Sequence, residues 1–290
     1  MKKFTLAIGQ IRPKLGDLKC NMERHIEVAK QAKDGGAHLI LFPELSLTGY
    51  SVRDLNAEVA LSMTDKFFDK LKLSSKEISI VAGAVIKDEN GGIRNSLLYF
   101  EDGIVKHVHY KVYLPTYGIF EEQRYFLPGR EVKAFDTKFG KLGLLICEDL
   151  WHVSLPYLLA IQGAKLVLAS AASPTRLSGD GGVHGGYAAN SEQHKTFARL
   201  LSIYVAFANR VGFEDGVNFW GGSEIISPHG EIVSSPQKES RLGEGIKLFD
   251  EGVFYSEIDL EEVDRARLFA RHFLDENPEL VVAHLKELGF

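Results

Sequence analysis

Residues 142–151 read Leu-Gly-Leu-Leu-Ile-Cys-Glu-Asp-Leu-Trp, an apolar run that ends in a cysteine followed by two acids. A short apolar run of this kind is typical of a β-strand that is buried on both faces. Because Glu148 and Asp149 follow at once, we expect the chain to leave the core directly after Cys147. The cysteine would then lie at the carboxyl end of a strand, where open α/β sheets build their sites.

Two other segments place a charged residue at the end of an apolar strand. Residues 38–42 are largely apolar and are followed by Pro43, which cannot donate to a sheet ladder, and then by Glu44. Residues 104–110 form a predicted strand that ends at Lys111. Taken singly, each residue is better explained as an exposed glutamate, a snorkelling lysine or a small buried cysteine. Together with Cys147 they form a candidate catalytic group.

The rest of the chain alternates between predicted strands and predicted helices. Strands are expected at residues 4–10, 38–42, 78–85, 95–100, 104–110, 132–137, 141–147, 166–170, 204–208, 224–227, 231–235 and 253–258. Helices are expected at residues 21–33, 61–73, 155–162, 192–202, 260–273 and 280–288. The glycine-rich residues 179–186 predict a mobile loop. Strand–helix alternation interrupted by hairpins predicts mixed sheets with helices outside, in one domain spanning residues 1–290.

The composition excludes several classes of protein. The 290 residues carry 34 Lys+Arg and 39 Asp+Glu, a net charge of −5, and 45 % are hydrophobic, which excludes a disordered chain. The charge provides no basic surface for nucleic acid or for a membrane. The two cysteines cannot form a disulfide framework, and we find neither a signal peptide nor an apolar run of 18 residues. We therefore expect a cytoplasmic protein without nucleic-acid or membrane partners.

The three strand-end residues suit acyl transfer. A thiolate on Cys147 needs a base to take its proton, and Glu44 can serve as that base. The tetrahedral oxyanion needs donors, which Lys111 and the backbone N–H of Glu148 can supply. Histidine is not required, because burial raises the pKa of a glutamate toward neutrality.

These segments resemble a known family. Phe42-Pro43-Glu44-Leu45, Tyr110-Lys111-Val112-Tyr113-Leu114-Pro115 and Leu145-Ile146-Cys147-Glu148-Asp149 are similar, in this order, to the signature segments of the nitrilase superfamily of carbon–nitrogen hydrolases. The resemblance implies a four-layer αββα sandwich over residues 4–259 with a helical tail at residues 260–290. It also implies a Glu-Lys-Cys triad, a thioester intermediate, and no metal or organic cofactor.

The resemblance also implies a second active-site glutamate. Residues 120–129, Phe-Glu-Glu-Gln-Arg-Tyr-Phe-Leu-Pro-Gly, are similar to the family segment that carries it. Counting back from Pro128 and Gly129 selects Glu122, and Glu121 remains the alternative. Its role would be to hold Lys111 and to orient the substrate amide.

The branch of the family is indicated by the residues around the cysteine. Cys147-Glu148-Asp149 lacks the Cys-Trp-Glu context of true nitrilases, and with residues 114–120 it resembles the glutaminase domain of glutamine-dependent NAD synthetase. No ATP-pyrophosphatase domain precedes the last residue, Phe290, so we expect a free-standing amidase acting on a small-molecule amide. A nitrilase and an N-carbamoyl amidohydrolase are alternatives, and a non-catalytic binding protein on the same scaffold is a third.

The substrate-binding residues are expected beside the motifs. We select Tyr117, Glu148, Trp151 and Arg176, the last as a partner for a substrate carboxylate, although a surface-loop arginine is an equal alternative. Neighbouring positions add further pocket candidates, namely Phe120, Pro174, Tyr187 and Trp220. His107 and His109 face the same way along a strand, but no third ligand is placed, so no metal is expected.

The predicted helical tail suggests self-association. Residues 280–283, Leu-Val-Val-Ala, form an apolar stretch that is longer than we expect at the solvent-exposed edge of a single domain. The resemblance also implies association through helices. We therefore expect a homodimer or a larger homo-oligomer.

Overall fold

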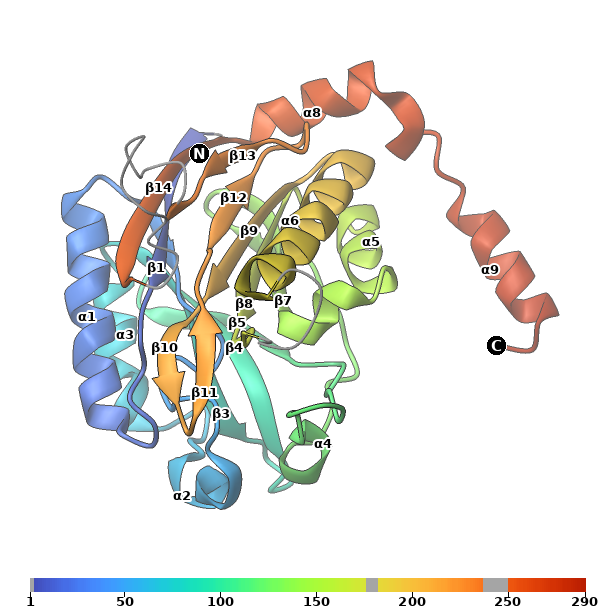
Figure 1. The fold of residues 1–290 in the computed structure, drawn as a ribbon. Helices are drawn as coiled ribbons and strands as arrows, with labels where there is room; N and C mark the ends of the chain where they lie inside the picture. Colours follow the sequence, from blue (N-terminus) through green and yellow to red (C-terminus); the bar gives the residue numbers. More distant parts are fainter. Residues whose placement is uncertain (1–2, 176–181, 237–249) are drawn as a thin grey trace.

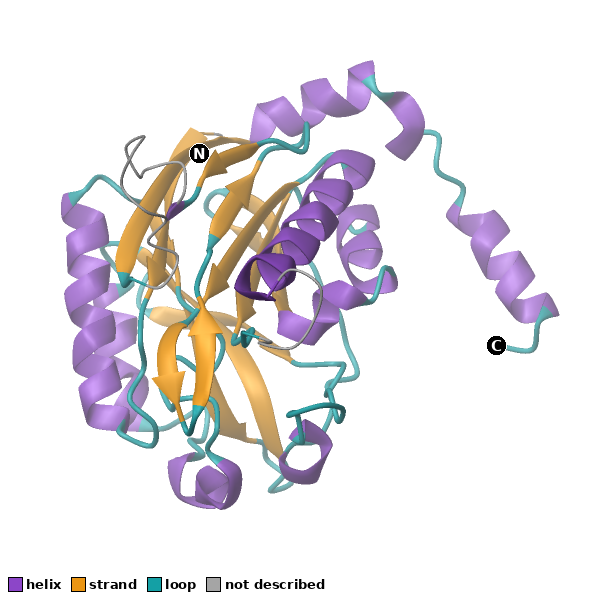
Figure 2. Ribbon diagram, in the orientation of Figure 1, coloured by secondary structure: helices purple, strands orange, loops and turns teal. Residues whose placement is uncertain are grey.

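Two six-stranded sheets lie face to face at the centre of the protein, and helices cover their outer faces (Figure 1 and Figure 2). The computed structural model describes residues 3–175, 182–236 and 250–290. The first sheet has the order β14-β1-β2-β3-β4-β5 and the second β13-β12-β9-β8-β7-β6. Both are mixed, since β1-β2-β3 and β7-β8-β9 are parallel and the remaining pairs are antiparallel. The expected α/β sandwich with mixed sheets is confirmed.

The strands have the following bounds. The first sheet contains β1 (Lys3–Gln10), β2 (Leu39–Leu41), β3 (Ser79–Lys87), β4 (Ile93–Glu101), β5 (Ile104–Tyr110) and β14 (Gly252–Asp259). The second contains β6 (Phe135–Thr137), β7 (Gly140–Ile146), β8 (Leu166–Ala171), β9 (Tyr204–Asn209), β12 (Glu224–Ile226) and β13 (Ile232–Ser234). A separate hairpin is formed by β10 (Val211–Glu214) and β11 (Val217–Trp220).

The helices connect these strands. They are α1 (Leu18–Asp34), α2 (Asn56–Val59), α3 (Asp69–Ser74), α4 (Glu122–Tyr125), α5 (Ser154–Ile161), α6 (Gly182–Leu201), α8 (Leu260–Phe269) and α9 (Pro278–Glu287). Short 3₁₀ turns occur at η1 (Arg53–Leu55), η2 (Lys66–Phe68), η3 (Cys147–Trp151) and η4 (Arg271–Phe273). Within the described ranges, no helix is both long enough and apolar enough to span a membrane.

Side-chain alternation along the strands produces the four layers. In β1, Leu6 and Ile8 point into the core between the sheets, whereas Ala7 points outward and packs with α1. In β7, Leu144 and Ile146 point into the same central core, and Leu145 packs outward with α5 and α6. Strands with two buried faces need apolar residues at every position, which explains the continuous apolar runs of the sequence.

Three segments differ from the sequence-based expectations. Residues 61–73 are not one helix, because Leu61 forms a parallel bridge with Ile86 and only η2 and α3 follow. The glycine-rich stretch is partly helical, since α6 begins at Gly182. The β10–β11 hairpin was not predicted, although Asp215-Gly216 at its turn is a hairpin signal and both residues have positive φ.

Close backbone approaches bring the strand ends of the candidate site together. A Cβ on Gly83 in β3 would lie 2.3 Å from the backbone nitrogen of Leu45, directly after Glu44. A Cβ on Gly129 would lie 2.1 Å from the carbonyl oxygen of Tyr110, directly before Lys111. Neither contact leaves room for a side chain, so glycine is required at both places.

Candidate active site

Glu44 is held in one orientation by three donors. It follows β2, and its side chain is fully buried. Asn95 Nδ2 and Lys111 Nζ each donate to its Oε1 at 2.7 Å, and the backbone N–H of Ala172 donates to its Oε2 at 2.8 Å. Leu45, the next residue, has a left-handed φ of 47°. A carboxylate fixed at both oxygens is well placed to exchange a proton in a constant direction.

Lys111 lies between two glutamates. Its Nζ donates to Glu44 Oε1 and to Glu122 Oε1, each at 2.7 Å, and the lysine side chain is fully buried. Tyr50 donates its hydroxyl to the same oxygen of Glu122 at 2.7 Å. The other oxygen of Glu122 has no hydrogen-bond partner among the described residues. Glu121, the alternative, is exposed.

Cys147 begins the 3₁₀ turn η3 directly after β7. Its φ of 46° is left-handed, a conformation that is strained for a residue with a side chain and that is enriched at functional sites. The sharp turn ends the strand as the apolar run predicted. It also directs the thiol side chain into a pocket instead of into the ladder of the second sheet.

The charges of the glutamates and of the lysine act on one another and on the thiol. Burial raises the pKa of the Cys147 thiol well above its ordinary value, and the negative charge of Glu44 raises it further, while Lys111 lowers it. Burial alone would lower the pKa of Lys111, but Glu122 and Glu44 outweigh it and raise that pKa. Burial also raises the pKa of Glu122. The free thiol therefore stays protonated and needs a base to ionise.

A pocket of about 280 Å³ opens over the thiol. Cys147 shares its wall with several residues that the sequence singled out, Tyr117, Phe120, Glu148, Trp151, Pro174 and Trp220. Ser173 and three residues of α6, Gly186, Ala189 and Asn190, complete the lining. Four aromatic residues therefore line the pocket, with one carboxylate, that of Glu148, at its wall.

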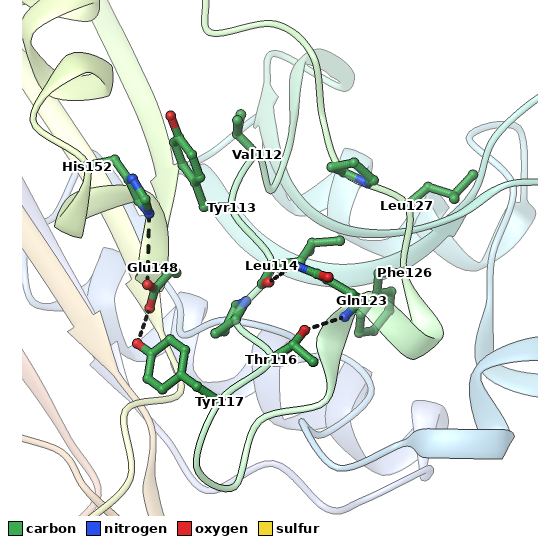
Figure 3. A pocket seen from close by; sticks show the side chains of 12 residues that line it. Val112, Tyr113, Leu114, Thr116, Tyr117, Gln123, Phe126, Leu127, Glu148 and His152 are labelled. Carbon is green, nitrogen blue, oxygen red and sulfur yellow. Dashed lines mark hydrogen bonds and ion pairs between the residues drawn. The ribbon is translucent and has the colours of Figure 1, made fainter.

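A wider outer groove of about 820 Å³ adjoins this pocket (Figure 3). Tyr117 and Glu148 belong to both cavities and separate them. The Tyr117 hydroxyl donates to Glu148 Oε2 at 2.9 Å, and His152 Nε2 lies 3.9 Å from Glu148 Oε1. The carboxylate of Glu148 thus accepts a hydrogen bond at the mouth of the pocket (Figure 3).

Two of the selected pocket residues are not among those that the structure places in the pocket wall. Arg176 lies outside the described residues. Tyr187 packs edge-on against Trp220, with ring centroids 5.7 Å apart, and does not line the pocket. Tyr50 and Asn95, which hold Glu122 and Glu44, were not selected from the sequence. A polar Asn95 at the start of a buried strand was the available signal.

The two strand histidines do not form a metal site. His107 stacks on Phe135, with ring centroids 4.2 Å apart, and His109 Nε2 contacts Asp149 Oδ2 at 2.8 Å. Across residues 3–175, 182–236 and 250–290, no group of three His, Cys, Asp or Glu side chains is arranged to hold a metal ion.

Comparison with known proteins identifies the family. The model of the carbon-nitrogen hydrolase family matches residues 5–268, which is most of the chain. The chain belongs to the carbon-nitrogen hydrolase family. The expected resemblance to the nitrilase superfamily is therefore confirmed, and the carbon-nitrogen hydrolase fold accounts for the two packed sheets.

The relatives of this carbon-nitrogen hydrolase include a group of synthetases and a group of amidases. The chain is 34 % identical over 268 residues to a glutamine-dependent NAD(+) synthetase of Acinetobacter baylyi, covering 90 % of this chain and 45 % of that protein. The chain thus spans about half the length of the synthetases it matches. The solved synthetase of Acinetobacter baumannii has a TM-score of 0.78 at 31 % identity, over 90 % of this chain and 47 % of its own.

A solved amidase represents the second group. A variant of the amidase from Nesterenkonia sp. AN1 superimposes with a TM-score of 0.77 at 23 % identity, over 97 % of this chain and 96 % of its own. It carries the acetamide moiety of fluoroacetamide on its active-site cysteine. At this identity the likeness establishes that the carbon-nitrogen hydrolase described above shares the amidase fold.

Proposed function

We propose that this protein hydrolyses a small-molecule amide to a carboxylate and ammonia through a thioester on Cys147. The observation that carries the proposal is the buried Glu44–Lys111–Glu122 group, joined by two 2.7 Å contacts, together with the Cys147 thiol that lines a pocket and whose pKa these three charges change. Nucleophile, base and cationic donor are the groups that acyl transfer requires.

The first half of the reaction forms the thioester. Glu44 takes the proton of the Cys147 thiol, and the thiolate attacks the amide carbon. Lys111 Nζ and the backbone N–H of Glu148 donate to the oxyanion that forms. Glu44 returns the proton to the amide nitrogen as the carbon–nitrogen bond breaks, and ammonia leaves.

The second half regenerates the thiol. Glu44 accepts a proton from an attacking water, and the hydroxide adds to the thioester carbon at the same donors. The carbon–sulfur bond breaks, and the thiolate takes the proton back from Glu44. The unpartnered oxygen of Glu122 would accept a hydrogen bond from the substrate amide N–H₂, which orients the amide above the thiol.

The substrate proposed here carries a positive charge near its amide. The carboxylate of Glu148 at the pocket wall, with Tyr117 and Trp151 beside it, favours an ammonium group or another hydrogen-bond donor. The sequence alone assigns Arg176 as a partner for a substrate carboxylate, and with that assignment we propose an ω-amide of an amino acid, such as glutamine, as the substrate. The similarity to glutamine-dependent NAD(+) synthetases supports the same substrate class.

Ammonia release tests the proposal. Purified protein would be incubated with glutamine, aliphatic amides, N-carbamoyl amino acids and nitriles of matched acyl chain, with Cys147→Ala as the control. We expect the ω-amide to release ammonia fastest, and only with the parent protein. Turnover confined to nitriles or N-carbamoyl compounds would select one of those alternatives. Absence of turnover together with slow alkylation of Cys147 by iodoacetamide would select the non-catalytic binding protein.

A further inference from the structure

A single buried carboxylate joins the segments that carry Lys111 and Cys147. Asp149 is fully buried and accepts four hydrogen bonds. Its Oδ1 accepts from the backbone N–H groups of Val112 and Tyr113, each at 3.0 Å. Its Oδ2 accepts from the backbone N–H of Ile146 at 3.0 Å and contacts His109 Nε2 at 2.8 Å.

These partners flank the two candidate catalytic residues. Val112 directly follows Lys111, and Ile146 directly precedes Cys147. Lys111 follows β5 of the first sheet, whereas Cys147 follows β7 of the second. Asp149 therefore joins the two sheets at the strand ends that carry Lys111 and Cys147. In Figure 3 the segment from Val112 to Tyr117 runs beside the turn that carries Glu148 and His152.

The bond to Ile146 also closes the strained turn. Cys147 has a φ of 46°, and such a conformation persists only where its surroundings determine it. Asp149 lies three residues beyond Ile146 and reaches back to its N–H, so the carboxylate fixes the first turn of η3. None of the four bonds involves the thiol, so Asp149 acts on the backbone that carries it.

We propose that Asp149 is a positioning residue that sets the distance between the Cys147 thiol and the Lys111 ammonium. His109 supports it by filling the remaining lone pair of Oδ2. The proposal rests on the proposed function, because it assigns a role in the same site. It predicts that loss of one carboxylate oxygen lowers thiol reactivity and turnover while substrate affinity is retained.

Asp149→Asn is the sharpest variant. Asparagine keeps the size of the side chain and an oxygen for Val112 and Tyr113. Its N–H₂ group cannot accept from Ile146, so the bond that closes the turn is lost. A displacement near 1 Å costs about 100-fold in rate, so we expect kcat to fall about 100-fold with KM within about threefold of the parent.

Alkylation of Cys147 provides a readout that needs no amide substrate. The rate with iodoacetamide would be followed by mass spectrometry in a Cys20→Ser background, since Cys20 is exposed. We expect Asp149→Asn to lower the alkylation rate at least tenfold, because the Lys111 ammonium would no longer lie at the distance from which it stabilises the thiolate. If the parent hydrolyses none of the tested amides, the proposed function fails and the alkylation rate still decides the role of Asp149.

Asp259→Asn is the matched control. Asp259 is also buried and accepts a backbone hydrogen bond from Glu261 at the start of α8, and its carboxylate otherwise contacts Arg265 and Lys3, which are not site residues. The Asp259→Asn control should be less stable than the parent, but its kcat and its rate of Cys147 alkylation should be unchanged. Equal rates in Asp149→Asn and the parent, per folded molecule by circular dichroism, would overturn the proposal, as would a loss of kcat matched by the control.

A pair of His109 variants tests the positioning role if Asp149→Asn does not fold. His109→Gln keeps an N–H donor toward Asp149, and His109→Leu removes it. We expect His109→Leu to slow alkylation several-fold and His109→Gln to restore most of the rate. Equal alkylation rates in the two variants and the parent would contradict the positioning role.

Discussion

Lys111 Nζ and Glu44 Oε1 lie 2.7 Å apart, and both side chains are fully buried. Taking two charges out of water is costly, and their attraction offsets the cost only while both partners remain. Glu122 adds a second negative charge beside the lysine. Removal of Lys111 would leave two carboxylates facing each other in the core.

The first prediction concerns that pair. Lys111→Met should abolish turnover and lower the free energy of unfolding by about 3–5 kcal/mol, the usual cost of leaving a buried charge without its partner. Glu44→Gln keeps the shape and should abolish turnover with a smaller loss of stability. Urea unfolding and ammonia release measure the two effects. A fully stable Lys111→Met variant would show that the glutamates do not depend on the lysine charge.

The second prediction concerns the nucleophile. Cys147→Ala should abolish hydrolysis and leave the fold intact, because the thiolate is the only nucleophile proposed and alanine fits wherever cysteine does. Circular dichroism checks the fold, and ammonia release checks the activity. Cys20→Ser, at the exposed cysteine, is the control and should retain full activity. Substantial turnover by folded Cys147→Ala would count against covalent catalysis through this residue.

The third prediction separates amides from nitriles. Attack on an amide produces an oxyanion, which Lys111 and the backbone N–H of Glu148 can bind at once, whereas attack on a nitrile produces a nitrogen anion that must first be protonated. We expect kcat/KM for a primary amide to exceed that of the matching nitrile by about 100-fold, or about 2.7 kcal/mol. Equal rates, or a faster nitrile, would assign the protein to the nitrilase branch.

The fourth prediction concerns the pH dependence of stability. His25 is buried, with Nδ1 2.7 Å from the carbonyl oxygen of Asn21 and Nε2 2.8 Å from Ser46 Oγ. Burial lowers the pKa of His25 from 6.5 to about 4. Between these values the unfolded chain binds a proton that the folded chain does not. The stability present above pH 6.5 is therefore lost as the pH falls toward 4, by about 3 kcal/mol.

Urea unfolding between pH 4 and 7 tests this linkage. His25→Gln should show a shallower decrease, and the exposed His284→Gln should follow the parent. Burial also lowers the pKa of His107 to about 4, so part of the decrease should remain in His25→Gln. A parent protein with constant stability over this range would contradict the assignment of His25 as a neutral group.

The fifth prediction concerns self-association. Helix α9 stands apart from the two sheets (Figure 1), and its apolar residues Leu280, Val281, Val282 and Leu285 are exposed by 41–55 %. Burial of these side chains between copies would remove an apolar surface from water. Sedimentation should give a dimer or larger species at micromolar concentration. The double substitution Val281→Glu and Leu285→Glu should lower the sedimenting mass toward the 32.2 kDa of a single chain, whereas Lys286→Glu should leave that mass unchanged.

Most of the fold and the three strand-end residues were predictable because their signals are local. An apolar run followed at once by a proline, a lysine or an acid indicates both a buried strand and the carboxyl end at which a catalytic residue can lie. Glu44, Lys111 and Cys147 are examples. Helix periodicity failed at residues 61–73, since the bridge between Leu61 and Ile86 outweighs the local helical preference.

The residues that hold the site in place were harder to predict. Tyr50 contacts Glu122 across 72 positions, and Asn95 contacts Glu44 across 51. Such pairs depend on the final packing of the sheets. A polar residue at the start of a buried strand marks Asn95 as unusual, but the neighbouring residues indicate neither its partner nor that of Tyr50. Asp149 was noted as an acid that ends the strand, but its four bonds depend on β5 and β7 meeting.

The division of the site between two sheets has a consequence for refolding. Glu44 and Lys111 come from the first sheet, and Cys147 comes from the second. Strand pairing is confined within each sheet, whereas the three residues meet only when the central core between the sheets closes. After dilution from urea, the recovery of activity should therefore lag behind the return of the β-sheet circular dichroism signal. The rate of this recovery should equal the rate at which the two sheets dock.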